Sequence, residues 1–286
     1  MSAPHPVLYR PLIQEALRED LGHGDVTTNA LLPEGLKGEG EIKAKEELVL
    51  CGVEVARLVF EELDPELEFE PRCLDGTLLS PGEVVARIKG QVSSILKGER
   101  VALNFLQHLS GVATTTYRFV KKIEDLPAKV VDTRKTLPGF RVLEKYAVKV
   151  GGGTNHRFGL SDGVLIKDNH IKACGGVKEA LTRARKHLPH VYRIEIEVKN
   201  LEELKEALEA GAEAILLDNM DLETLRQAVA LAREKDPGIV LEASGGVSLE
   251  NVRAIAETGV DLISVGRLTH SAPAVDLNLK LVRIFS

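Results

Sequence analysis

The chain has 286 residues, of which 44% are hydrophobic and 4% aromatic, and its formal net charge is −6 with a pI near 5.8. This length and composition fit two globular domains, or one large barrel with an appendage, while an acidic chain without tryptophan argues against a nucleic-acid partner. Three cysteines without CxxC spacing, an N-terminus without a signal-peptide pattern, and the lack of any apolar run of about 18 residues predict a cytoplasmic protein with neither a disulfide framework nor a membrane span.

The first third of the chain mixes helices and strands without a repeating order. Apolar residues at helical spacing predict an amphipathic helix through Leu8, Leu12, Ile13, Ala16 and Leu17. The stretches GEIKAKEELVL (40–50) and GEVVARIKG (82–90) alternate apolar and polar residues, as strands do. We expect a long helix over residues 94–124, ending before Pro127, to bridge to the next domain. Residues 1–112 are therefore predicted to form an α/β domain.

From about residue 128 the pattern changes to strand, helix, strand, helix. Helical patterns such as LEELKEALEAG (201–211) separate six short β-rich runs. These runs cover residues 128–133, 162–168, 192–198, 213–219, 238–244 and 261–266. Six parallel strands with crossover helices form either a doubly wound sheet or a barrel of the TIM type.

Polar side chains at the strand ends decide between these two folds. An open sheet gathers its ligand groups at one switch point, whereas a barrel collects them from nearly all strand ends on one face. Each of the six runs ends in such side chains, among them Lys135, Lys167, Glu197, Asp218, Glu242 and Ser264. We therefore predict an open, incomplete α/β barrel over residues 113–270, with the C-terminal tail (271–286) packed on the N-terminal domain.

A basic segment interrupts the acidic chain between Asp132 and Lys172. It holds eight Lys/Arg and four Asp/Glu, so its net charge is 8 − 4 = +4, and −6 − 4 = −10 remains for the rest. Capture of a small anion explains this segment better than nucleic-acid binding, which spreads charge over a basic domain. Arg141, Lys145 and Lys149, spaced by four, are expected to line an exposed helix face. The candidates for the anion site are Arg134, Lys135, His156, Arg157 and Lys167.

Carboxylates also converge at the strand ends. Glu195 and Glu197 are two residues apart, so both point to one face of their strand, where buried carboxylates must be paired or bound to metal. With Asp218 at the end of the next strand, these oxygen ligands suit Mg²⁺, which prefers one or two carboxylates with phosphate oxygens and water. Salt bridges to nearby arginines and lysines are the structural alternative.

Two glycine-containing loops follow neighbouring strands, SGGV at 244–247 and SVGR at 264–267. Glycines let backbone N–H groups approach an anion, and a helix expected to begin near Leu249 would add its positive dipole end. Together the loops predict a phosphate site. The GGG at 151–153 follows a helical pattern and is interpreted as a helix cap.

Lys167 ends a buried strand and admits two chemistries, a Schiff-base nucleophile or an anion-binding cation. The neighbouring Asp168 and the converging carboxylates keep the amine charged, which favours anion binding. His156 and His170, in a site rich in anions, are expected to be protonated donors.

Six strings resemble the quinolinate phosphoribosyltransferase family, and in order they span nearly the whole chain. They are EDLGHGDVTT, NFLQHLSGVAT, DTRKTLPGFR, KVGGGTNHRFGLSDGVLIKDNH, LLDN and EASGGV. The resemblance implies an N-terminal α/β sandwich with an open α/β barrel, in a homodimer whose active sites lie between subunits. It also implies a decarboxylating enzyme of NAD synthesis that uses Mg²⁺. Quinolinate and phosphoribosyl pyrophosphate would give nicotinate mononucleotide, pyrophosphate and CO₂.

The resemblance also assigns roles to residues of these motifs. The shell around the pyridine dicarboxylate would comprise Arg134, His156, Arg157, Lys167 and, from the partner subunit, Arg100. Lys135 and Lys167 would also contact the phosphoribosyl donor, while Glu197 and Asp218 would hold its metal and ribose hydroxyls. The 5-phosphate would lie against Ser244, Gly245, Gly246 and Gly266, and His270 is a further family position. Glu195 also fits the pattern of the metal-side carboxylate.

Three other functions stay open at this point. A related transferase could act on another anionic ring such as nicotinate, although quinolinate, with two carboxylates, needs the denser cation shell. A non-catalytic barrel could bind an anion, but that role gains nothing from Glu197 and Asp218. A Schiff-base aldolase would use Lys167 as its nucleophile.

Overall fold

A computed structural model describes residues 3–285, and these fold into two compact units. The first unit comprises residues 3–117, 136–152 and 268–285, and the second comprises residues 118–135 and 153–267. None of the described helices combines the length and apolar character that a membrane crossing needs.

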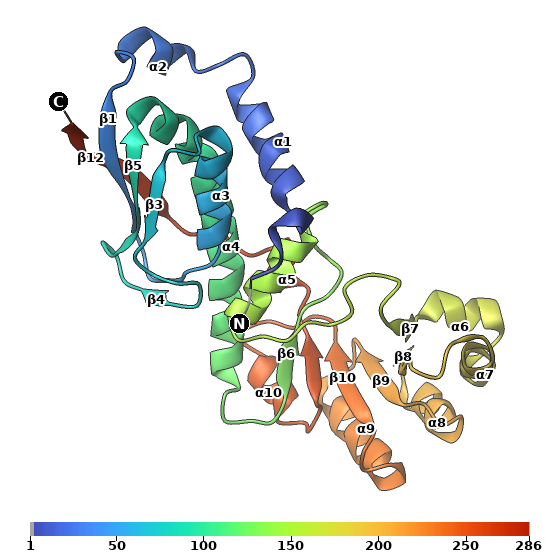
Figure 1. Cartoon of the computed structure of the whole chain (residues 1–286). Coiled ribbons are helices and arrows are strands. Elements are labelled where there is room, and N and C mark those ends of the chain that lie inside the picture. The colour runs from blue at the N-terminus through green and yellow to red at the C-terminus, as the bar shows by residue number, and fades with distance from the viewer. Residues whose placement is uncertain (1–2, 286) are drawn as a thin grey trace. The chain divides into compact units, whose positions relative to one another are not determined.

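The first unit contains an antiparallel sheet in the order β12-β1-β5-β3 (Figure 1). Its strands are β1 (Lys37–Ala44), β3 (Glu68–Pro71), β5 (Val84–Gln91) and β12 (Leu277–Phe285). The two stretches of alternating polarity predicted as strands thus form β1 and β5. The C-terminal strand β12 pairs with β1 along its length. A second small sheet joins β2 (Leu48–Val49) and β4 (Leu78–Leu79).

The helices of this unit are η1 (Pro6–Leu8), α1 (Arg10–Leu21), α2 (Val26–Leu31), α3 (Val53–Leu63), α4 (Val92–Lys122) and α5 (Arg141–Val150). In this α/β sandwich α3 packs against β3, and α1 packs against α3. The core includes Leu58 and Phe60 of α3 and Ile88 of β5, all at most 1% exposed. The helix predicted over 94–124 is α4. Its Gly98 lies so close to Phe60 that a Cβ there would stand 2.7 Å from the ring.

Two expectations about helices of this unit are wrong in detail. Leu8 lies in η1 and is 60% exposed, because α1 begins only at Arg10. Pro11, which has no backbone N–H, is tolerated in the first turn of α1. Lys145 is 3% exposed, so α5 does not present it to solvent; a lysine is buried only when polar partners surround it. Gly151 caps α5, donating its N–H to Ala147 O at 3.0 Å, as predicted.

The second unit is an open α/β barrel of six parallel strands in the order β6-β11-β10-β9-β8-β7. The strands are β6 (Lys129–Val131), β7 (Val164–Ile166), β8 (Ile194–Val198), β9 (Ala214–Asp218), β10 (Val240–Ser244) and β11 (Leu262–Ser264). Each lies in one of the six predicted runs, which confirms the predicted fold class. Among the described residues no ladder joins β6 to β7, and the barrel is open there.

Helices follow the strands of this barrel, and Figure 1 shows α8 and α9 running alongside β9 and β10. The helices are α6 (Asp168–Cys174), α7 (Val177–His187), α8 (Leu201–Glu209), α9 (Leu222–Lys235) and α10 (Val252–Ala256); α11 (Arg267–His270) spans the boundary between the two units. Asn200 caps α8 by accepting from Glu203 N at 2.8 Å, and Asp221 caps α9 by accepting from Thr224 N at 2.8 Å. Because the strands are parallel, their carboxyl ends share one edge of the sheet.

Candidate active site

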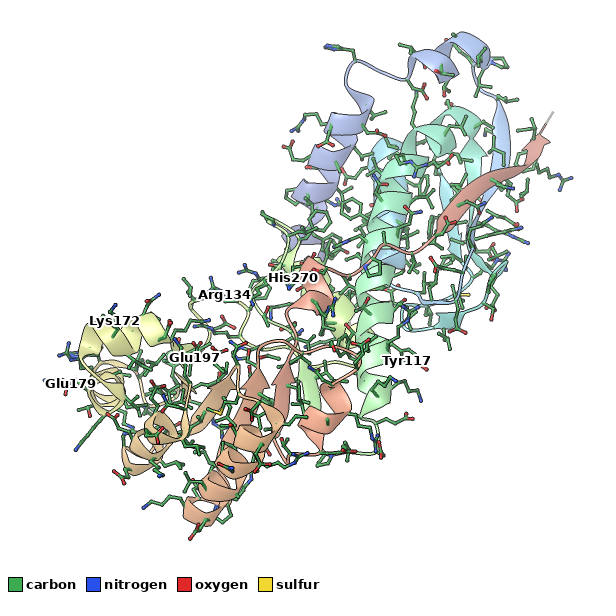
Figure 2. The ribbon with its side chains drawn as sticks, turned by 180° about the vertical axis from the view of Figure 1, so that it is seen from behind. Tyr117, Arg134, Lys172, Glu179, Glu197 and His270 are labelled. Carbon is green, nitrogen blue, oxygen red and sulfur yellow. The ribbon has the colours of Figure 1, made fainter. Side chains whose placement is uncertain are left out.

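A cavity of about 460 Å³ opens at the carboxyl ends of the barrel strands. Eight residues predicted for the site line it: Arg134, Lys135, His156, Arg157, Lys167, Glu197, Asp218 and Ser244. Its other lining residues are Thr133, Leu165, Leu216, Glu242 and Ser264. Figure 2 shows Arg134 and Glu197 at the same end of the strands. The barrel thus brings together side chains up to 131 residues apart in the chain, counted from Thr133 to Ser264.

The cationic side of the cavity comes from the segments after β6 and before β7. Lys135 N donates to Thr133 Oγ1 at 3.0 Å, which shapes the turn that carries Arg134. Arg157 donates from Nη1 to Gly163 O at 3.0 Å. Burial lowers the pKa of Arg157, and the nearby Arg134 guanidinium lowers this pKa further. Two guanidiniums held close enough to repel each other form a favourable place for a planar anion.

The anionic side of the cavity is formed by Glu197 of β8 and Asp218 of β9. Burial, followed by the Asp218 carboxylate, raises the pKa of Glu197. Lys167 opposes this shift, since its Nζ lies 3.6 Å from Glu197 Oε2. Two repelling carboxylates on neighbouring strands are a suitable donor set for a hard divalent cation.

The SGGV loop meets the LLDN motif at the end of the sheet. Asn219 N donates to Ser244 O at 2.8 Å, and a Cβ on Gly245 would stand 2.2 Å from Asn219 Oδ1. Both Gly245 (φ +97°) and Gly246 (φ +60°) have left-handed backbone conformations. The loop therefore exposes backbone rather than side chains.

The helix expected near Leu249 begins later than predicted. It is the five-residue α10, which starts at Val252. Asn251 holds the intervening turn, because it accepts from Ser248 N at 2.8 Å and donates to Gly246 O at 3.0 Å. The loop shape thus depends on an asparagine that the sequence pattern did not single out.

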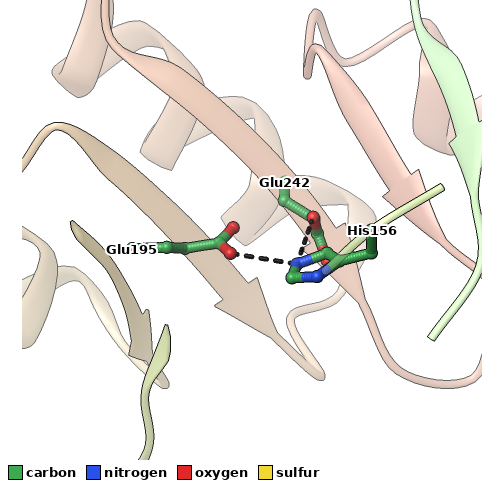
Figure 3. A group of neighbouring side chains, drawn as sticks. All are labelled: His156, Glu195 and Glu242. Atoms are coloured by element: carbon green, nitrogen blue, oxygen red, sulfur yellow. Dashed lines mark hydrogen bonds and ion pairs between the residues drawn. The ribbon is translucent and has the colours of Figure 1, made fainter. Parts of the chain in front are cut away.

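A polar cluster of His156, Glu195 and Glu242 (Figure 3) includes two of the residues that line the cavity, His156 and Glu242. His156 Nε2 lies 3.0 Å from Glu195 Oε2 and 3.5 Å from Glu242 Oε2. Burial, followed by the Glu195 carboxylate, raises the pKa of Glu242 to about 7. Asp132, with no exposed surface, accepts from His156 N at 2.9 Å and from Asn155 Nδ2 at 2.5 Å. The donor atoms of His156, Glu195 and Glu242 lie within 4.8 Å of one another, a spacing that could also hold a cation.

The structure separates the two candidate carboxylates of β8. Glu195 contacts His156, whereas Glu197 lies near Lys167 and Asp218. The role of Glu242 was missed by sequence reasoning. Its signal was its place among the polar side chains near the strand ends, which did not indicate a contact with His156.

The two histidines each accept a backbone N–H at Nδ1. Nδ1 of His156 accepts the backbone N–H of Arg157 at 2.7 Å, and Nδ1 of His170 accepts that of Lys167 at 2.9 Å.

The remaining predicted residues do not line the cavity. Gly245 and Gly246 follow Ser244 directly in the chain, and Gly266 lies two residues after Ser264. Arg100 is exposed on α4, and His270, at the end of α11, is exposed as well; both belong to the first unit.

Comparison with known proteins gives matches over most of the chain. The family model of the quinolinate phosphoribosyl transferase C-terminal domain matches residues 112–280, and that of the N-terminal domain matches residues 25–110. A probable nicotinate-nucleotide pyrophosphorylase (carboxylating) from Synechocystis is 45% identical, covering 98% of this chain and 95% of that protein. One from Bacillus subtilis is 44% identical, covering 94% and 92%. The crystal structure of NadC from Streptococcus pyogenes is 42% identical, with a TM-score of 0.94 and 99% of each chain covered.

Proposed function

The chain belongs to the quinolinate phosphoribosyltransferase family, and from this premise we propose how its cavity binds and converts the two substrates. The enzyme transfers phosphoribosyl from phosphoribosyl pyrophosphate to quinolinate, giving nicotinate mononucleotide, pyrophosphate and CO₂ in NAD biosynthesis.

One observation carries the assignment of roles. The cavity contains a pair of repelling cations, Arg134 and Arg157, and a pair of repelling anions, Glu197 and Asp218. A dicarboxylate relieves the first repulsion and a divalent cation the second. A ring with two carboxylates and a metal–pyrophosphate group therefore complement opposite sides of one cavity.

Quinolinate is held on the cationic side. Arg134 and Arg157 each present a planar guanidinium that can grip a carboxylate by two parallel hydrogen bonds, which fixes the ring orientation. Lys167 lies between the two sides of the cavity and serves both substrates. Its Nζ lies 3.6 Å from Glu197 Oε2, a contact that would position it near the reacting atoms.

The phosphoribosyl donor is held on the anionic side and by the glycine loops. Glu197 and Asp218 would hold Mg²⁺ and the ribose hydroxyls, and their carboxylate oxygens suit that ion. When bound, Mg²⁺ would neutralise charge on the departing pyrophosphate. Lys135 adds a cation to the same group. The 5-phosphate is received by Ser244 and by the backbone of Gly245, Gly246 and Gly266.

The residues act mainly by position and charge. They hold the ring nitrogen in line with C1 of the ribose while the C1–O bond to pyrophosphate breaks. The alkylated ring is cationic, so it accepts the electron pair left when the adjacent carboxylate leaves as CO₂. A proton then replaces the carboxylate at that carbon.

We also propose that the working enzyme is a cytoplasmic homodimer or an assembly of dimers. The exposed Arg100 of one subunit would complete the quinolinate shell of the other, with His270 as a further contact of less defined role. The free state of Cys51, Cys73 and Cys174 supports a reducing compartment.

Substrate choice is tested by turnover with trapping of CO₂. We expect quinolinate with phosphoribosyl pyrophosphate to release one CO₂ for each pyrophosphate, and nicotinate to react far more slowly, because it leaves one of the two guanidiniums without a carboxylate. Equal turnover of nicotinate would assign the enzyme to a different anionic ring.

A further inference from the structure

Glu242 is the most deeply buried carboxylate of the barrel's cavity wall, and the roles proposed above do not use it. It is 1% exposed, and neither of its oxygens has a hydrogen-bond partner among residues 3–285. An ionised carboxylate in that position would carry a large desolvation cost. Its place in the middle of β10 therefore needs a reason.

The groups that face Glu242 come from four neighbouring segments. Glu195 approaches from β8, His156 from the segment before β7, and Asp132 from the end of β6. From β11 the Ser264 hydroxyl lies nearby and is directed to Ala243 O at 3.5 Å. The adjacent strand β9 contributes an apolar residue, Leu216, at the matching register. The surroundings are thus net anionic, and a proton on Glu242 relieves their mutual repulsion.

The His156 ring links Glu242 to Arg157, which lines the cavity. Its Nδ1 accepts the Arg157 N–H at 2.7 Å, so the single ring proton is on Nε2, between Glu195 and Glu242. If both carboxylates were ionised, they would favour a doubly protonated ring. Its new Nδ1–H would then oppose the Arg157 N–H, donor against donor, and the contact that orients Arg157 would be lost.

We propose that Glu242 is a positioning residue for quinolinate binding: from beneath His156 it sets the ring, and through the ring and the backbone of Arg157 it directs the guanidinium that grips the substrate carboxylate. The inference rests on the proposed substrate-binding role of Arg157. In this role Glu242 works as a neutral acid. Burial and Glu195 raise its pKa to about 7, so it is protonated below that pH and ionised above it.

The neutral isostere separates this role from the alternatives. We expect Glu242→Gln to keep the KM for quinolinate within about twofold of wild type at pH 6.5, because an amide matches a protonated carboxyl in shape and charge. Glu242→Ala, which leaves a hole under the ring, should raise that KM by about tenfold or more, the scale of a lost buried polar contact. The KM for phosphoribosyl pyrophosphate should stay within about twofold in both variants.

The pH profile gives a second readout that a purely structural role would not move. Wild type should lose affinity for quinolinate as pH rises from 6.5 to 8.5, and Glu242→Gln should lose less, since it has no proton to release there. This comparison stands even if Glu242→Ala does not fold.

Four results would overturn the inference. One is a KM for quinolinate that rises as much in Glu242→Gln as in Glu242→Ala, which would mean that an ionised Glu242 carboxylate is needed. Another is a parallel rise of both KM values, as expected of general loss of structure, and a third is an unchanged pH profile. The fourth is one transition-metal ion per chain in the washed wild-type enzyme, bound where the proton is proposed. Failure of wild type to turn over quinolinate would instead refute the function from which the inference starts.

Discussion

Gly245 and Asn219 approach so closely that a Cβ atom on the glycine would stand 2.2 Å from Asn219 Oδ1. Asn219 is itself the one non-glycine residue with positive φ (54°) in the described chain. The loops after β9 and β10 are therefore fitted to each other, and Asn219 N donates to Ser244 O across them. This fit keeps the phosphate loop open to backbone contacts.

Gly245→Ala should impair binding of phosphoribosyl pyrophosphate strongly. The added methyl group meets both a strained φ and a filled space, at a cost of about 2–4 kcal/mol, shared between folding and loop displacement. Gly246→Ala is the matched control, since its φ is also positive but nothing lies within 4 Å of the new Cβ. Thermal unfolding and the KM for the donor would measure the difference. Equal effects of the two substitutions would contradict the close fit.

Arg134→Ala and Lys135→Ala should each lose about 1.5–3 kcal/mol of transition-state stabilisation, the scale of a charged hydrogen bond. For Arg134 the loss should appear with quinolinate, and for Lys135 with the phosphoribosyl donor, because they serve different substrates. Steady-state kinetics with each substrate varied in turn would show this split. Lys149→Ala, an exposed lysine of the same basic segment, is the control. Kinetics near wild type for either site variant would refute its role.

Much of the fold and most of the cavity could be predicted from local patterns. The six β-rich runs place Lys167, Glu197 and Asp218 at strand ends, and parallel strands bring their ends to one edge whatever the details of packing. Spacing by two puts Glu195 and Glu197 on one face of β8. That much depends only on backbone geometry.

What could not be predicted depends on contacts between distant segments. No local pattern shows that Glu242 faces His156, because the residue on the opposing segment is 86 positions away, counted from 156 to 242. The tautomer of His156 likewise depends on a backbone N–H next to it, and the late start of α10 depends on the side chain of Asn251. The periodicity of apolar residues predicts which face of a helix or strand is buried. It does not predict which faces of different helices and strands pack together.

Asp218→Asn should raise the Mg²⁺ concentration needed for half-maximal activity by about tenfold or more, because the amide contributes no negative charge to the proposed metal. The maximal rate at saturating Mg²⁺ should recover in part. Activity measured against Mg²⁺ concentration after removal of metal with a chelator would test this. Wild-type activity that survives such removal without added Mg²⁺ would argue against a metal-dependent reaction.

Mixing two inactive variants tests whether the site is shared between subunits. Arg100→Ala and Lys135→Ala should each be nearly inactive, and subunit exchange should restore activity, because half of the mixed dimers' sites would combine two intact halves. Recovery of up to about a quarter of wild-type activity is expected from random pairing of equal amounts in C2 dimers. If exchange is demonstrated by mass and no activity returns, Arg100 does not act across the dimer.

Tyr9→Phe should leave the free energy of unfolding at pH 7 unchanged or raise it by up to about 1 kcal/mol, since the Tyr9 hydroxyl is buried without a hydrogen-bond partner in the described chain. Burial, followed by Glu54, raises the pKa of Tyr9 from 10.0 to about 12. The folded state then holds a proton that the unfolded state releases above pH 10. Wild type should therefore lose about 1 kcal/mol of stability per pH unit between pH 10 and 12 through this group, and Tyr9→Phe should not.

Tyr146→Phe provides the opposite case within the same unit. Its hydroxyl donates to Asp75 Oδ2 at 2.9 Å, so removing it should cost about 1.5–3 kcal/mol at pH 7, as for other bonds to a charged acceptor. Urea unfolding of wild type, Tyr9→Phe and Tyr146→Phe at pH 7 and pH 10.5 would give the free energies of unfolding to compare. Because both variants delete one hydroxyl oxygen from a tyrosine ring, equal destabilisation would mean that Tyr9 has a hydrogen-bond partner after all. A loss of unfolding free energy in Tyr146→Phe alone would show that the effect of removing the hydroxyl depends on whether that hydroxyl has a hydrogen-bond partner.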